Sequence, residues 1–121
     1  MNVNLNLSAE DTQALYKAIT LTIVDNKSGT SQPKVAKKLA HLKQFRDRMH
    51  SKNADIIDKS DWTAILFALN CSRRFYSHNI NMCELHDVDP DNSDYIELVN
   101  DFNRLTNLLQ HLSESVASAE N

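Results

Sequence analysis

Glycine is almost absent from this sequence of 121 residues, in which Gly29 is the single one. Phosphate-binding loops of the GxxxxGKS/T and GxGxxG types need at least two glycines, because the backbone must turn at positive φ and approach the ligand closely. The GxSxG nucleophile elbow fails for the same reason. The sequence therefore excludes these loops and this type of hydrolase.

Cysteine and long apolar runs are also scarce. The two cysteines are Cys71 and Cys83, and Cys71 falls inside an apolar stretch, so we expect no disulfide framework. The N-terminus has no basic segment followed by a long apolar one, as a signal peptide would. No apolar run approaches the ~20 residues that cross a bilayer. We therefore expect a cytoplasmic protein with reduced thiols and no membrane contact.

What is present is the composition of an ordinary globular domain, with 41% hydrophobic and 24% charged residues. The stretch Asp61 to His78 is apolar on two faces of a helix, so it should be buried on both and lie at the centre. We predict a mainly α, four-helix bundle-like single domain over residues 1–116. Residues 117–121 should form a frayed tail.

Boundary signals predict the other helices. Ser8 and Asp11 read as a capping box that opens the first helix, which should end near Asn26. Pro33 suits the first turn of a second helix over residues 31–52, and Ser60 should cap the central helix. The last helix carries an apolar heptad stripe made of Leu98, Phe102, Leu105, Leu109, Leu112 and Val116.

The N-terminus alternates Val3, Leu5 and Leu7 with asparagines, which is the period of a half-buried strand. Residues 79–82 alternate in the same way and are the expected partner inside the chain. Pairing across a subunit interface, or an extended arm packed on the helices, are the alternatives. Because both the strand and the heptad stripe offer surfaces that need covering, we expect a homo-oligomer.

The second helix has the most unusual surface. Between Lys27 and Lys52 the chain has eight Lys or Arg residues and one Asp, a local charge of +7. Many of these cations fall on one side of the helix, and Phe45 lies among them. Cations interleaved with an aromatic ring are typical of nucleic-acid or nucleotide binding. The candidate anion-binding residues are Lys34, Lys37, Lys38, His41, Phe45, Arg48 and Lys52.

An acidic segment, residues 84–101, has the opposite charge. It contains seven Asp or Glu residues and no Lys or Arg. The two segments either pair inside the fold, in which case neither implies a partner, or form opposite poles of the molecule. The acidic segment could also occupy the basic groove of a partner protein, as nucleic-acid mimics do.

Four residues have the chemistry of zinc ligands, namely Cys71, His78, Cys83 and His86. Cys83 and His86 are close enough in sequence to chelate one ion. Cys71 and His78 would be ~10.5 Å apart along a helix, too far for one tetrahedral site. We therefore predict no metal and no other cofactor.

No set of nucleophile, base and orienting group is evident, so we expect no catalysis. Our first hypothesis is a small non-enzymatic regulatory protein that engages nucleic acid or a nucleotide through the basic face of helix 31–52. The alternatives are a protein-binding inhibitor or assembly subunit that uses segment 84–101, and a zinc-binding module.

Overall fold

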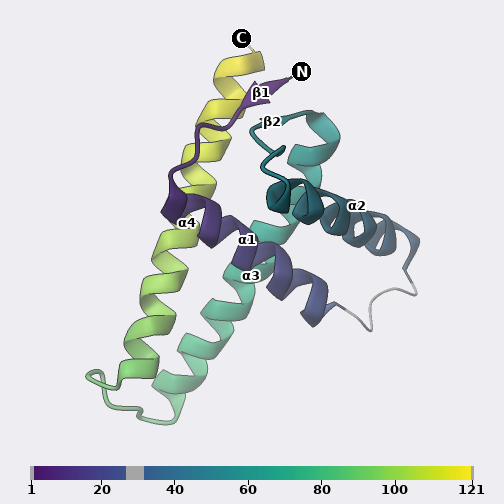
Figure 1. Ribbon diagram of the computed structural model, residues 1–121. Helices are drawn as coiled ribbons and strands as arrows, with labels where there is room; N and C mark the ends of the chain where they lie inside the picture. The colour runs from purple at the N-terminus through teal and green to yellow at the C-terminus, as the bar shows by residue number, and fades with distance from the viewer. Residues whose placement is uncertain (1, 27–31, 121) are drawn as a thin grey trace.

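The computed structural model describes residues 2–26 and 32–120. Figure 1 shows four packed helices and a small sheet. The elements are β1 (Val3–Asn4), α1 (Ala9–Asp25), α2 (Pro33–His50), β2 (Ile56–Ile57), α3 (Lys59–Leu85) and α4 (Ser93–Glu120). The predicted mainly α, four-helix architecture is confirmed. Residues 117–120, expected to fray, continue α4, and residue 121 lies outside the described residues.

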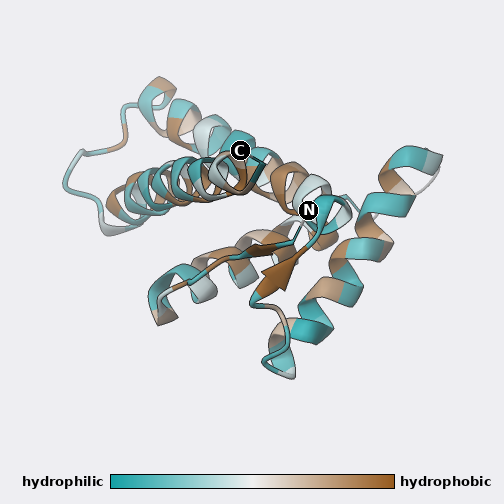
Figure 2. Ribbon diagram, turned by 90° about the horizontal axis from the view of Figure 1, so that it is seen from above, coloured by the Kyte–Doolittle hydropathy of each residue, from teal (hydrophilic) through white to brown (hydrophobic). Residues whose placement is uncertain are grey.

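Helix α3 is the central element, as predicted, because it packs against each of the other three helices. It forms a long antiparallel hairpin with α4. Helix α1 crosses this hairpin, and α2 lies beside the upper part of α3 and packs against α3 and α1 (Figure 1). Helix α1 approaches α3 closely, since Thr22 Oγ1 donates to the Ala68 carbonyl at 3.1 Å and Ser72 Oγ donates to the Ala18 carbonyl at 3.0 Å. Ile65 and Leu69 of α3 are fully buried. Each helix carries both hydrophobic and hydrophilic residues, as helices buried on part of their surface do (Figure 2).

The heptad stripe of α4 is only partly the buried face. Leu105, Leu112 and Val116 are buried as predicted, whereas Leu109 is half-buried and its neighbour Leu108 is buried in its place. An α-helix drifts relative to a strict seven-residue repeat, and this drift brings Leu108 into the core. The stripe is therefore used within the chain, against α3.

The N-terminal strand exists, but its predicted partner was wrong. β1 pairs antiparallel with β2, with Val3 opposite Ile57, and the Leu5 amide donates to the Asp55 carbonyl at 2.8 Å. Residues 79–82 instead belong to α3, which continues to Leu85. A four-residue alternation does not distinguish a strand from a helix, and here the apolar face of a long helix decided the outcome.

The ends of the helices follow capping chemistry. The Ser8 hydroxyl accepts from the Asp11 amide at 3.0 Å, which is one half of the predicted capping box. The predicted cap of α3 was wrong, because Asp58 takes the place of Ser60. The Asp58 carboxylate accepts from the Asp61 amide at 2.8 Å, and the Asp61 carboxylate accepts from the Asp58 amide at 3.2 Å. A carboxylate at each position completes a capping box, which Ser60 cannot do from inside the helix.

Pro33 is at the start of α2, as predicted, and the helix ends at His50 rather than at Lys52. The predicted exit from α1 at Lys27, Ser28 and Gly29 lies outside the described residues. The short connection between α2 and β2 therefore begins two residues earlier than expected.

Candidate anion-binding groove

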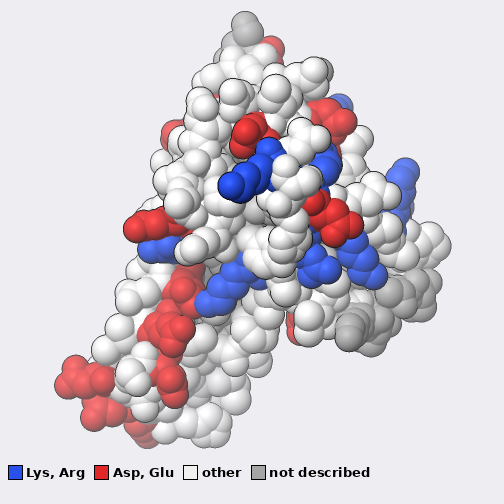
Figure 3. All heavy atoms as spheres, in the orientation of Figure 1, with Lys and Arg blue, Asp and Glu red and all other residues white. Residues whose placement is uncertain are grey.

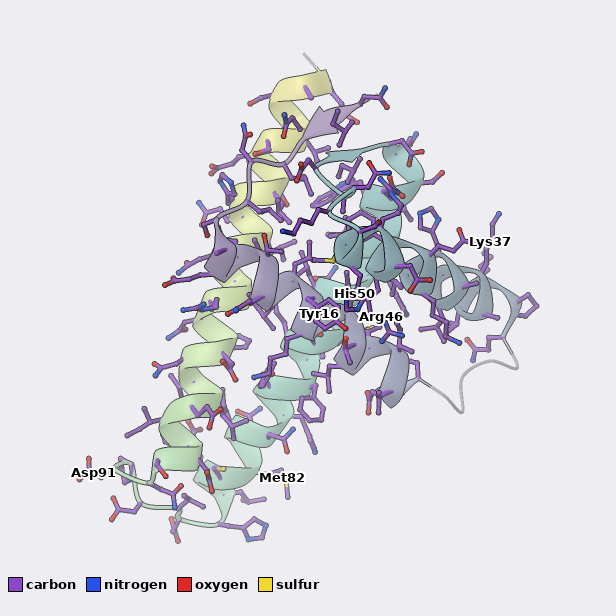
Figure 4. The ribbon with its side chains drawn as sticks, viewed as in Figure 1. Tyr16, Lys37, Arg46, His50, Met82 and Asp91 are labelled. Carbon is purple, nitrogen blue, oxygen red and sulfur yellow. The ribbon has the colours of Figure 1, made fainter. Side chains whose placement is uncertain are left out.

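The seven candidate anion-binding residues do not form one surface. Lys34 and Lys37 are exposed on α2, and Figure 4 shows Lys37 directed into solvent. Lys52 is exposed and lies beyond the end of α2, with a φ of 58°. Lys38 and Arg48 are half-buried against other parts of the fold. The basic face therefore divides into exposed cations and cations with partners inside the fold.

Phe45 does not belong to the basic face, which corrects the prediction. Its ring is 1% exposed and is part of the core together with Leu39 and Leu42. These three residues are spaced by three, so the buried arc of α2 is rotated toward Phe45, and Val35 is only half-buried. The Arg48 guanidinium carbon lies 5.1 Å from the Phe45 ring centroid. This ring is unavailable to a ligand.

His41 and Arg48 are engaged by one buried carboxylate, that of Asp61, whose side chain is 5% exposed. His41 Nε2 lies 2.6 Å from Asp61 Oδ1, and Arg48 Nη1 donates to both Asp61 oxygens at 3.0 Å. Arg48 also donates to the carbonyls of Asn53 and Ile56 at 3.2 and 2.9 Å. These two side chains therefore join α2 to α3 and to the β2 segment.

The pKa of the Asp61 carboxyl reflects this environment. Burial raises its pKa, because it disfavours the charged form. Hydrogen bonds from His41, Arg48 and the Asp58 amide, together with the charge of Arg48, oppose this and hold the pKa below its ordinary value. The carboxylate is consequently ionised and serves as an internal counter-ion for α2.

A groove of about 620 Å³ lies along α3, with Lys38 of α2 on one side and Phe102 of α4 on the other. The residues that α3 contributes recur every three or four positions and so share one face. They are Thr63, Leu66, Phe67, Asn70, Arg73, Arg74 and Ser77. The lining contains three cations, Lys38, Arg73 and Arg74, and no Asp or Glu. Such a groove favours an anion.

Aromatic rings hold two of the three cations. Lys38 Nζ lies 5.0 Å from the centroid of the Phe67 ring, and Arg73 Cζ lies 5.5 Å from that of Phe102. Arg73 Nε also donates to Thr106 Oγ1 at 3.2 Å. Cation–π contacts of this kind attract a cation without neutralising its charge. Lys38 and Arg73 are therefore positioned and still able to bind an anion.

Arg73 and Arg74 were not among the predicted site residues. Cations suit the helix dipole only in the last turn of a helix. Because α3 continues to Leu85, Arg73 and Arg74 lie in its interior, and the dipole does not explain their presence. Of the seven predicted anion-binding residues, Lys38 alone lines this groove. The double arginine beside Phe75 was the local signal in the sequence for the part of the site on α3.

The four candidate zinc ligands do not come together. Cys71 and Cys83 are half-buried free thiols, and His78 and His86 are exposed. Within residues 2–26 and 32–120, no three His, Cys, Asp or Glu side chains have an arrangement that could hold a metal ion.

The acidic segment occupies the closed end of the α3–α4 hairpin. Figure 3 shows Asp and Glu side chains gathered at this end, away from most Lys and Arg side chains, which lie over α1 and α2. One member of the segment is paired, since Asp101 Oδ2 lies 3.0 Å from Lys17 Nζ of α1. In the described part of the chain no ion pair joins α2 to residues 84–101. The basic and acidic segments therefore lie at opposite poles of the molecule, which is one of the two predicted arrangements.

Across the described ranges, no helix has both the length and the apolarity needed to cross a bilayer. Comparisons of the chain with protein-family models, with curated proteins and with solved structures find no match.

Proposed function

We propose that this protein is a non-enzymatic binding protein whose α3 groove takes a phosphate-bearing ligand, either nucleic acid or a nucleotide. One observation carries the proposal. Lys38, Arg73 and Arg74 converge on a single groove whose lining contains no carboxylate. Three neighbouring cations repel one another, and a phosphate ligand relieves this repulsion through charge-assisted hydrogen bonds.

The positioning of the cations supports binding in a second way. Ordering a long charged side chain costs conformational entropy when a ligand binds. Lys38 and Arg73 already rest on Phe67 and Phe102, so part of this cost is met during folding. Lys34 precedes Lys38 by one turn, so it is an exposed cation on the same face of α2.

Catalysis has less support. His41 and Asp61 form the one contact between a histidine and a carboxylate within the described residues. Arg48 and the Asp58 amide take up the Asp61 oxygens, so this pair is committed to joining α2 and α3. A histidine held in this way positions α2 against α3, and no neighbouring side chain is assigned as a nucleophile for it to activate.

Binding is tested with fluorescent single-stranded DNA, duplex DNA and a nucleoside triphosphate as probes at low salt. Because three cations line the groove, affinity for a single strand should fall with salt, with a log–log slope of roughly −2. The double variant Arg73→Glu/Arg74→Glu should abolish most binding. The matched control Lys43→Glu/Lys59→Glu makes the same change in net charge at exposed residues outside the groove.

Equal losses in the two double variants would mean that net charge, and not the groove, drives binding. If none of the three probes binds at low salt, the proposed function is wrong. Thermal unfolding of each variant separates loss of binding from loss of fold.

A second candidate function, the protein-binding inhibitor, is favoured by one observation. The closed end of the α3–α4 hairpin exposes three large apolar side chains among its acids, with Leu85 73% exposed and Met82 and Ile96 less so. Figure 4 shows Met82 and Asp91 at this end of the hairpin. Acidic and apolar side chains together suit a basic amphipathic partner.

A cationic amphipathic helical peptide tests this candidate as the probe. Binding that is lost in Leu85→Ser/Ile96→Ser, and kept in Arg73→Glu/Arg74→Glu, would support a separate protein-binding surface. A peptide that binds both variants as well as it binds the unaltered protein would exclude the hairpin end as its site.

A further inference from the structure

We infer that the ligand of the α3 groove is single-stranded nucleic acid, with phosphates at Lys38, Arg73 and Arg74 and a base against the Arg73 guanidinium. This inference rests on the proposed function, because it names the form of the phosphate ligand. It follows from the spacing, the partial burial and the shape of the cationic groups.

The spacing of the cations suits a chain of phosphates. Lys38 is held over Phe67, and Arg73 follows Phe67 by six residues, which corresponds to roughly 9 Å along the helix axis. Each cation is held on its own ring, so the two occupy separate positions along the groove. A ligand with successive phosphates reaches both positions at once.

The partial burial of two of the three cations favours a single strand over a duplex. Lys38 and Arg73 are half-buried and line the groove together with Phe67 and Phe102, whereas Arg74 is exposed. A duplex is stiff and presents its phosphates on a convex surface, whereas its bases are paired inside. A single strand is thin and flexible, and its unpaired bases are free to enter the groove.

The shape of Arg73 gives the base a surface. The guanidinium is planar, and its position is set by the Phe102 ring on one side and by the bond from Nε to Thr106. Arginine planes stack nucleic-acid bases, as aromatic rings do. Leu66 and Asn70 line the adjacent floor and offer an apolar contact and an amide for a base edge. Because every base has a π face, we expect little sequence preference.

The first experiment uses the full chain and three DNA probes of equal length at low salt, namely a single strand, a duplex and an abasic single strand. The abasic strand retains the phosphates and lacks the bases. The single strand should bind tightest, and the abasic strand should bind roughly 5- to 150-fold more weakly for each stacked base that is lost.

Two matched variants test the position of the base. Arg73→Lys and Arg74→Lys both keep the charge and remove a guanidinium plane, but only Arg73 lies over a ring. Arg73→Lys should weaken binding of the single strand roughly 5- to 150-fold, with the salt slope and the affinity for the abasic strand unchanged. Arg74→Lys should change binding much less.

Two results would overturn the inference and leave the proposed function standing. One is equal affinity for the single strand and the duplex, and the other is equal affinity for the normal and abasic strands. A nucleoside triphosphate that binds as tightly as the single strand would likewise show that no chain is required. If Arg73→Lys does not fold, the abasic comparison on the unaltered protein still decides the matter.

Discussion

Arg48 Nη1 donates to both carboxylate oxygens of Asp61 at 3.0 Å, and this contact joins the C-terminal half of α2 to the first turn of α3. The Asp61 side chain is nearly inaccessible to water, whereas the Arg48 side chain is about one-third exposed. Removal of one partner from such a pair leaves an uncompensated charge in the interior. The stability of the protein should therefore depend strongly on it.

We predict that Arg48→Ala destabilises the protein by about 3 kcal/mol, because the Asp61 carboxylate stays buried without the two hydrogen bonds and the charge of Arg48. Urea unfolding measures the change. The matched control is Lys17→Ala, which breaks the exposed pair with Asp101 and should cost less than about 1 kcal/mol. Equal costs for the two variants would mean that the Arg48 pair contributes no more than a surface pair.

Acid should weaken the same contact. The pKa of Asp61 is held below its ordinary value of 3.8, so its ionised form is favoured by folding. The resulting stabilisation is complete above about pH 5 and is lost as the pH falls through the lower pKa of the folded state. We expect the difference in unfolding free energy between the unaltered protein and Asp61→Asn to shrink below about pH 5. A difference that stays constant between pH 7 and pH 2 would contradict this.

The central position of α3 predicts a large contrast between two of its leucines. Leu69 is 0% exposed and Leu85 is 73% exposed. Leu69→Ala should cost about 2–5 kcal/mol, because it leaves a cavity in the core. Leu85→Ala should cost less than about 0.5 kcal/mol, as a surface substitution does. Chemical denaturation of both variants measures the two losses of stability. A small loss in Leu69→Ala would show that Leu69 is not packed in the core.

Self-association stays a prediction, although the two surfaces from which it was predicted are covered within one chain. The N-terminal strand pairs with β2, and the apolar stripe of α4 packs on α3, so neither needs a second copy. The attraction that can still bring two copies together is electrostatic, between the acidic hairpin end of one copy and the basic groove of another. We expect any oligomer seen by light scattering at low salt to dissociate at high salt and in Arg73→Glu/Arg74→Glu. A mass of 13.8 kDa at low salt and high concentration would contradict self-association.

Much of the fold could be predicted because its signals are local. The apolar faces of Asp61 to His78, the Ser8 cap and the position of Pro33 each depend on residues within a few turns. The wrong predictions arose where two neighbouring residues could each fill the same structural role. Asp58 and Ser60 are both good caps, and the choice depended on the reciprocal bond from the Asp61 carboxylate.

The candidate site was harder to predict because it is formed by residues distant in sequence. The sequence showed a basic run in α2, but it did not show that Asp61 would engage His41 and Arg48. The groove combines Lys38 with Arg73 and with Phe102 of α4, and no periodicity links residues on three helices. Only the packing of these helices brings the cations together.

The position of Asp61 has a consequence for motion. One carboxylate caps α3, holds the α2 side chains and, through Arg48, holds the backbone of the β2 segment. These segments should open together, so that their amide hydrogens exchange as one cooperative unit. Lys38 precedes His41 by one turn of the same helix, so an opening event that frees α2 also disturbs the groove. A ligand bound at Lys38 would therefore slow amide exchange at residues 55–61, which it does not touch.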